Sequence, residues 1–157
     1  YLQDAKGCDV TGIDVSSSAV SRARERGIQA YTMDVTRERP KGSFDFIVLS
    51  AFIEHVVNSE EVICRFLEAS DQLLISIPNI AFVEHRLRLL FGHFPCQWAF
   101  HPSEHVRFWS VPDFRGEMTQ MGIEILEYCA DDGVPVLKDL WMNLFGQDIC
   151  FKLRRRK

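Results

Sequence analysis

The chain has 157 residues, a length typical of one domain, and its content of 46% hydrophobic and 25% charged residues is that of a globular protein. The net charge of −4 argues against a nucleic-acid partner, and no apolar run is long enough to cross a bilayer, so we expect no membrane partner. Five widely spaced cysteines without a CxxC pair indicate reduced thiols and predict a cytoplasmic protein.

Strands and helices alternate along the chain. The sequence predicts strands at 8–14, 28–35, 44–50, 73–77, 123–129 and 147–153, and helices at 17–26, 80–91 and 111–121, with a further helix that begins at Asn58. A short helix before Gly7 opens the chain, and the connection 130–146 is predicted to be long. The uninterrupted apolar run 46–49 is typical of a strand covered on both faces. This order predicts an α/β fold with a mostly parallel sheet in one domain, 1–157.

The first strand ends on a carboxylate. Asp14 follows the apolar residues of strand 8–14, and the hydroxyls of Ser16, Ser17 and Ser18 precede the next helix. Open α/β sheets bind their ligands at the carboxyl ends of the strands, where a carboxylate can accept hydrogen bonds from both hydroxyls of a ribose. A helix-capping or solvated loop acid is the alternative interpretation of Asp14, with equal weight.

Two further strand ends extend this site. Asp34 ends the second strand between Met33 and Val35, so its carboxylate can accept from an exocyclic amine while the apolar neighbours pack on a purine ring. Ser50 and Phe52 follow the third strand at the same edge. Together with Asp14 and Val15 these residues predict an adenosine-shaped slot.

These segments resemble the class I S-adenosylmethionine-dependent methyltransferases. Residues 12–16 (Gly-Ile-Asp-Val-Ser) look like that family's ribose-binding strand end, and 33–35 (Met-Asp-Val) like its adenine-binding turn. Residues 44–50 with Glu54-His55-Val56 look like its fourth strand and the turn that follows. The segments 74–79 and 105–110 resemble the subgroup that includes MetW. The resemblance implies a Rossmann-like sheet with helices on both faces, a C-terminal antiparallel hairpin and S-adenosylmethionine as cofactor.

The family's glycine-rich turn has no counterpart before Gly7. The resemblance therefore implies that the first central strand is absent from this chain, and we expect further residues upstream. It implies methyl transfer to a small-molecule acceptor, by a chain that by itself is inactive if the missing strand is essential. The alternatives are a non-catalytic partner of an acyltransferase in methionine biosynthesis and, third, an NAD-binding oxidoreductase. Exposed inner strand edges also allow a homo-oligomer.

His55 is the candidate general base, because it follows the strand end that flanks the transferred methyl group. We favour the plainer interpretation that Glu54 and His55 organise the turn. Some relatives hold a divalent metal at this turn with an acid three residues earlier, where this chain has Ala51, so we predict no metal there. His101, Glu104 and His105 resemble a ligand set, but Pro102 interrupts helical spacing, and a polar loop is the favoured interpretation.

Overall fold

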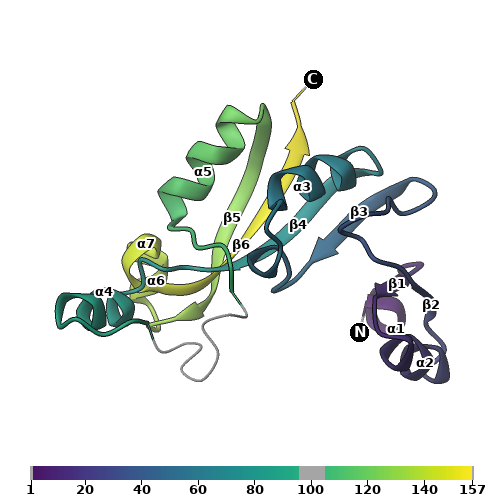
Figure 1. The fold of residues 1–157 in the computed structure, drawn as a ribbon, viewed down its shortest axis with the longest axis horizontal. Helices are drawn as coiled ribbons and strands as arrows, with labels where there is room; N and C mark the ends of the chain where they lie inside the picture. Colours follow the sequence, from purple (N-terminus) through teal and green to yellow (C-terminus); the bar gives the residue numbers. More distant parts are fainter. Residues whose placement is uncertain (1, 96–104, 157) are drawn as a thin grey trace. The chain divides into compact units, whose positions relative to one another are not determined.

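The computed structural model describes residues 2–95 and 105–156. The chain falls into two compact units, residues 1–40 and 41–157, and each is described by itself (Figure 1).

The first unit is a strand–helix–strand motif preceded by a short helix. It contains α1 (Leu2–Lys6), β1 (Thr11–Asp14), α2 (Ser17–Glu25) and β2 (Gln29–Thr32). The strands β1 and β2 are parallel, so α2 provides the crossover between them. Ser16 caps α2, because its hydroxyl accepts a hydrogen bond from the backbone N–H of Ala19 at 3.3 Å. Val20 and Ala30 form the small core, each 3% exposed.

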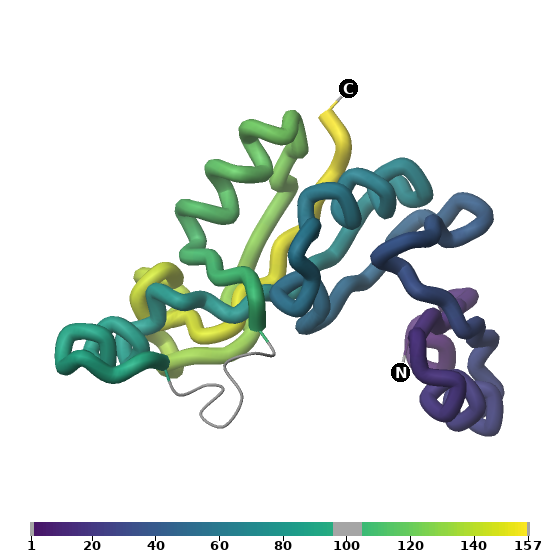
Figure 2. Tube along the Cα trace, in the orientation of Figure 1, coloured from purple at the N-terminus to yellow at the C-terminus, as the bar shows by residue number. Residues whose placement is uncertain are grey.

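The second unit is built on a four-stranded sheet, whose strands can be followed along the trace in Figure 2. Its strands are β3 (Phe44–Leu49), β4 (Ser70–Pro78), β5 (Ile123–Gly133) and β6 (Gly146–Arg155), in the order β3-β4-β6-β5. β3 and β4 are parallel, and β6 lies between β4 and β5, antiparallel to both. The predicted C-terminal antiparallel hairpin is therefore confirmed, together with the α/β class.

Within the described residues, six helical segments accompany this sheet. They are the 3₁₀ turn η1 (Ile53–His55), α3 (Ser59–Leu67), α4 (Val83–Leu90), α5 (Val111–Gln120), α6 (Leu137–Leu140) and α7 (Met142–Phe145). The helix α3 provides the crossover between β3 and β4 and packs on β4, and α5 packs on β5. The predicted start of α4 at residue 80 is wrong by three residues. The predicted end of the strand at residue 129 is four residues short, because β5 continues to Gly133, and the rest of the connection to β6 contains the short helices α6 and α7.

The core of this unit lies on one face of the sheet. Three cross-strand pairs of large apolar residues, each at most 1% exposed, join its central strands: Leu73 with Leu153, Ile75 with Phe151, and Ile77 with Ile149. Ile63 of α3 and Phe114 of α5 are also fully buried, and the Phe114 and Phe151 rings lie 4.6 Å apart. Fully burying such a side chain contributes about 1.5–3 kcal/mol, so these pairs fix the register of β4 against β6.

The prediction that the strand 44–50 is covered on both faces is wrong for the described residues. Phe46 and Val48 are each 52% exposed, while Leu49 is buried. The register gives the physical reason: Leu49 pairs with the buried Ile75, whereas Phe46 and Val48 pair on the opposite face with Gln72 and Leu74, which are only half-buried.

None of the helices among the described residues has the length and apolar content needed to span a bilayer.

Asn79 joins the end of β4 to the start of β6. The residue is fully buried, and its side-chain amide donates to the backbone carbonyls of Gly146 at 2.8 Å and Asn143 at 3.2 Å. Its side-chain oxygen accepts from the backbone N–H of Ala81 at 3.0 Å. One side chain therefore bonds three backbone groups, of which the Asn143 carbonyl also accepts from the Arg86 guanidinium at 3.3 Å.

We predict that Asn79→Ala lowers the free energy of unfolding by about 3 kcal/mol, because it leaves buried backbone groups without partners. Urea unfolding followed by circular dichroism measures this. Asn58→Ala is the matched control: Asn58 precedes α3 but makes no side-chain capping bond, so its cost should stay within about 0.5 kcal/mol. Equal losses for the two variants would contradict the role given to Asn79.

Candidate functional site

The carboxyl ends of β1 and β2 bring two acidic residues together. Asp14 is the last residue of β1 and is paired in register with Thr32, the last residue of β2. The backbone N–H of Met33 donates to the carbonyl of Asp14 at 3.1 Å, so the chain continues beside Asp14 into Asp34. The register thus places Asp14 at the end of β1, as predicted, and Asp34 two residues beyond the end of the adjacent strand β2.

One oxygen of the Asp14 carboxylate is hydrogen-bonded within its own turn. Its Oδ1 accepts from the backbone N–H of Ser16 at 2.7 Å, whereas Ser16 itself caps α2. No group in residues 2–95 and 105–156 donates a hydrogen bond to Asp14 Oδ2. Asp14 thus stabilises the turn before α2 without capping the helix, and its Oδ2 has no hydrogen-bond donor in the described part of the chain. Val15 beside it is 72% exposed.

The Asp34 carboxylate is held in its charged form. Its Oδ1 accepts from the hydroxyl of Thr36 at 2.6 Å and from the backbone N–H of Thr36 at 3.0 Å. These hydrogen bonds, with the Arg37 guanidinium 3.4 Å from Oδ2, hold the pKa of Asp34 below its usual range. Met33 and Val35 on either side are half-buried. A charged acceptor between two apolar side chains suits a purine that carries an exocyclic amine.

In the second unit, the end of β3 makes a tight turn against β4. Ser76 of β4 accepts from the backbone N–H of Ala51 at 2.9 Å and donates to the hydroxyl of Ser50 at 3.2 Å. Ala51 has a φ of 47°, the left-handed region that residues other than glycine enter at a cost. Phe52 follows, half-buried, and directs the chain into η1.

This turn opens on a cavity of about 230 Å³. It is lined by Ala51, Glu54, His55, Ser76, Ile77, Pro78, His105 and Asp148. Glu54 is 1% exposed although it is an acid, and burial raises its pKa despite the smaller lowering effects of a backbone hydrogen bond and of His55. The Asp148 carboxylate adds the smallest effect, a further rise. Nε2 of the exposed His55 lies 3.8 Å from Glu54 Oε1.

His105 reaches the same cavity from a distant part of the sequence. Its ring meets the ring of His55 edge to face, with centroids 4.6 Å apart. The backbone N–H groups of Val106 and Arg107 both donate to the backbone carbonyl of Glu54, at 2.9 and 3.1 Å. The Arg107 guanidinium forms an ion pair with Glu60 of α3. These contacts fix the segment that carries His105 against η1.

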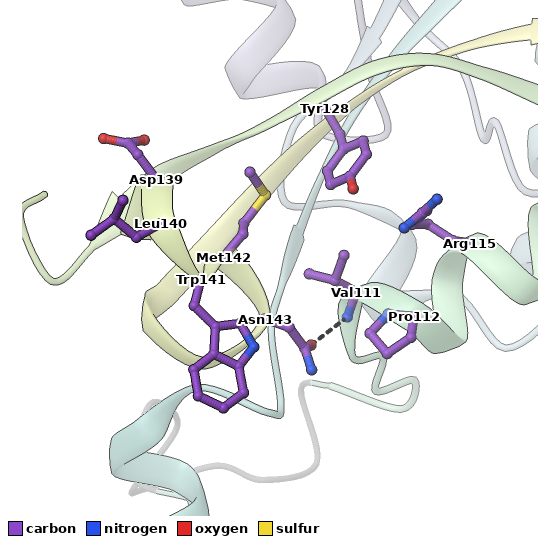
Figure 3. A pocket seen from close by; sticks show the side chains of 9 residues that line it. All are labelled: Val111, Pro112, Arg115, Tyr128, Asp139, Leu140, Trp141, Met142 and Asn143. Atoms are coloured by element: carbon purple, nitrogen blue, oxygen red, sulfur yellow. Dashed lines mark hydrogen bonds between the residues drawn. The ribbon is translucent and has the colours of Figure 1, made fainter. Parts of the chain in front are cut away.

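A second cavity, of about 550 Å³, lies elsewhere in this unit (Figure 3). Its walls come from α5, from Tyr128 of β5, and from the end of α6, the start of α7 and Trp141 between them: Val111, Pro112, Arg115, Tyr128, Asp139, Leu140, Trp141, Met142 and Asn143. The side-chain oxygen of Asn143 accepts from the backbone N–H of Val111 at 3.1 Å, the dashed line in Figure 3. This larger cavity shares no lining residue with the cavity at η1.

The predicted site residues therefore belong to two groups. Asp14, Val15, Met33, Asp34 and Val35 lie together at the strand ends of the first unit, and Ser50, Phe52 and His55 lie together at the end of β3 in the second.

The sequence interpretation missed the meeting of Glu54 and His55 with His105. Their spacing of about fifty residues gives no local signal, and only the contact of residues 106–107 with η1 reveals it. The suggested partners of His105, His101 and Glu104, lie outside the described residues.

Comparison with known proteins supplies the family. The family model described as "Methionine biosynthesis protein MetW" matches residues 1–153. A curated relative, the bifunctional methionine biosynthesis protein MetXA/MetW of Rhodopirellula baltica, is 25% identical over 127 residues, which are 74% of this chain. The match spans only 20% of that relative's length.

Solved structures show the same fold. An S-adenosylmethionine-dependent methyltransferase from Mesorhizobium loti has a TM-score of 0.64 at 15% identity, over 93% of this chain and 80% of that one. Magnesium protoporphyrin IX methyltransferase from Synechocystis PCC 6803, solved with bound SAH, has a TM-score of 0.62 at 14% identity, over 93% of this chain and 64% of that one. The predicted Rossmann-like fold of the methyltransferases is confirmed, and the chain belongs to the MetW family.

Proposed function

We propose that this chain binds S-adenosylmethionine and serves the transfer of its methyl group to a small-molecule acceptor. The observation that carries the proposal is the parallel pairing of β1 with β2, which ends on Asp14 and Thr32, two residues before Asp34. The methyltransferase fold of the solved neighbours supports it, because one of those neighbours was solved with bound SAH.

Each part of the nucleoside has a group suited to it. The Asp14 carboxylate keeps Oδ2 available for the ribose hydroxyls, with Val15 exposed beside it. The charged Asp34 accepts from the 6-amino group of adenine, and Met33 and Val35 pack on the faces of the ring. Charge-assisted hydrogen bonds of this kind are about twice as strong as those between neutral groups.

The end of β3 provides the residues for the methyl group and the acceptor. Ser50 and Phe52 are the cofactor-binding residues proposed for the second unit, at a turn held by Ser76. Methyl transfer from a sulfonium depends mainly on alignment of the acceptor. Where the acceptor must lose a proton, His55 is the base, since its ring is exposed and lies beside the buried Glu54.

We predict that Asp14→Ala weakens binding of S-adenosylmethionine to the intact protein by about 10- to 100-fold, because it removes charge-assisted hydrogen bonds to the ribose. Isothermal titration calorimetry measures the Kd. Asp9→Ala is the matched control, an exposed acid just before β1, and should leave the Kd unchanged. Unchanged affinity in Asp14→Ala, or binding of NAD with none of S-adenosylmethionine, would reject the proposal.

A second prediction tests Asp34 as the reader of the exocyclic amine. An analogue of S-adenosylhomocysteine with purine in place of adenine should bind the intact protein about 10-fold more weakly than S-adenosylhomocysteine itself. In Asp34→Ala the two compounds should bind alike, since the acceptor of the amine hydrogen bond is gone. An equal preference for S-adenosylhomocysteine over the purine analogue in both proteins would show that a group other than Asp34 accepts from the amine.

A second candidate function is supported by the bifunctional relative, whose name joins MetXA to MetW. In this alternative the chain assists an acyltransferase of methionine biosynthesis without transferring a methyl group. The segment 136–141 offers a surface for such a partner: Leu140 is 77%, Val136 71% and Trp141 56% exposed. Val136 sits in a strained tight turn, with φ 66° and ψ −47°, closed by a bond from the N–H of Leu137 to the carbonyl of Pro135 at 2.8 Å.

This alternative predicts that the intact protein co-purifies with the acyltransferase of the same organism and that Leu140→Glu breaks the complex. Leu90→Glu is the matched control, because Leu90 of α4 is 75% exposed and lies outside this segment. Retention of the acyltransferase by Leu140→Glu would argue against the surface. Methyl transfer to an acceptor by the isolated protein would argue against a purely non-catalytic role.

A further inference from the structure

A cluster of metal-ligating groups lies in the cavity at η1. Glu54, His55 and His105 each offer one ligand atom, and these atoms all lie within 4.8 Å of one another. The set contains one carboxylate and two imidazoles. Zn²⁺ and the divalent ions of neighbouring first-row metals take such mixed ligands, whereas Mg²⁺ and Ca²⁺ prefer oxygen alone.

The burial of Glu54 is an independent observation that points to a cation. Its side chain is 2% exposed, and Oε2 is buried without a hydrogen-bond partner in the described part of the chain. A buried carboxylate is costly unless it is protonated, paired or bound to a metal. The Asp148 carboxylate, which lines the same cavity, adds negative potential. The charge and the unsatisfied oxygen both favour a positive ion at this place.

The backbone already holds the ligands in place. Glu54 and His55 are consecutive in η1, and the two hydrogen bonds from residues 106 and 107 to the Glu54 carbonyl fix His105 opposite them. In a tetrahedral site with bonds near 2.1 Å the ligand atoms lie roughly 3.4 Å apart. The present upper limit of 4.8 Å exceeds this spacing by roughly 1.4 Å, which side-chain rotations of His55 and His105 would have to close.

We propose that Glu54, His55 and His105 bind one divalent first-row transition metal ion, with a fourth position open toward the cavity. The sequence prediction of no metal at this turn rested on Ala51, and His105 supplies the third ligand that the sequence did not reveal. An acceptor hydroxyl or a water molecule in the fourth position would be acidified by the ion. In that state His55 is a ligand and not the proton acceptor.

The test is calorimetric titration of the intact, chelator-treated protein with Zn²⁺, without S-adenosylmethionine, so that its result is separate from that of the cofactor proposal. The exposed thiols of Cys8, Cys64 and Cys129 are first alkylated, because they also bind zinc. One equivalent of Zn²⁺ should bind with a Kd of about 1 µM or lower, and Mg²⁺ should not bind.

Three variants and one control locate the site. His55→Gln, His105→Gln and Glu54→Gln should each weaken Zn²⁺ binding by about 100-fold, whereas the exposed His93→Gln should leave it unchanged. Because Glu54 is in the core, circular dichroism checks that Glu54→Gln is folded. If this variant unfolds, the two histidine variants decide the test. Absence of binding in the unmodified sequence, or full binding by both histidine variants, would overturn the proposal.

Discussion

Parallel pairing of strands is the constraint on which the functional geometry depends. A parallel pair needs a crossover, and α2 and α3 provide one in each unit, so the carboxyl ends of both strands meet at one edge. In the first unit this edge carries Asp14 and Asp34; in the second it carries the turn at Ser50 and Ser76. Polar residues that are far apart in the sequence become neighbours because the strand register aligns the ends of the two strands that they follow.

The two edges are built with different electrostatics. At the first, each carboxylate accepts hydrogen bonds from its own short turn, and Asp14 keeps Oδ2 without a donor among the described residues. The hydrogen bonds of Thr36 keep Asp34 charged, as is suited to a polar ligand that enters from solvent. At the second, Glu54 is buried in a cavity whose other acid, Asp148, raises its pKa further. A carboxylate in that environment is stable only with a proton or a cation, and two imidazoles lie beside it.

Much of this fold was predictable from local pattern. Gly7 and Gly27 end helices with positive φ as expected, and the apolar runs around Ile47 and Ile75 are strands. The exposure of Phe46 was not predictable, since an apolar run does not say which of its faces is covered. The short helices α6 and α7 have four residues each, about one turn, so an apolar pattern cannot repeat within them. The approach of His105 to Glu54 depends on long-range packing. The interpretation of 1–157 as one incomplete methyltransferase domain stays a prediction.

The central claim is that the two acids at the strand ends of the first unit hold the ribose and the base of one nucleoside. A crystal structure of the intact protein with S-adenosylhomocysteine tests it most directly. The account predicts ribose hydroxyls within 3.2 Å of the Asp14 carboxylate, a normal hydrogen-bond length, and the adenine amine at the same range from Asp34. A nucleoside bound away from both acids, with Asp14 still engaged only by Ser16, would contradict it.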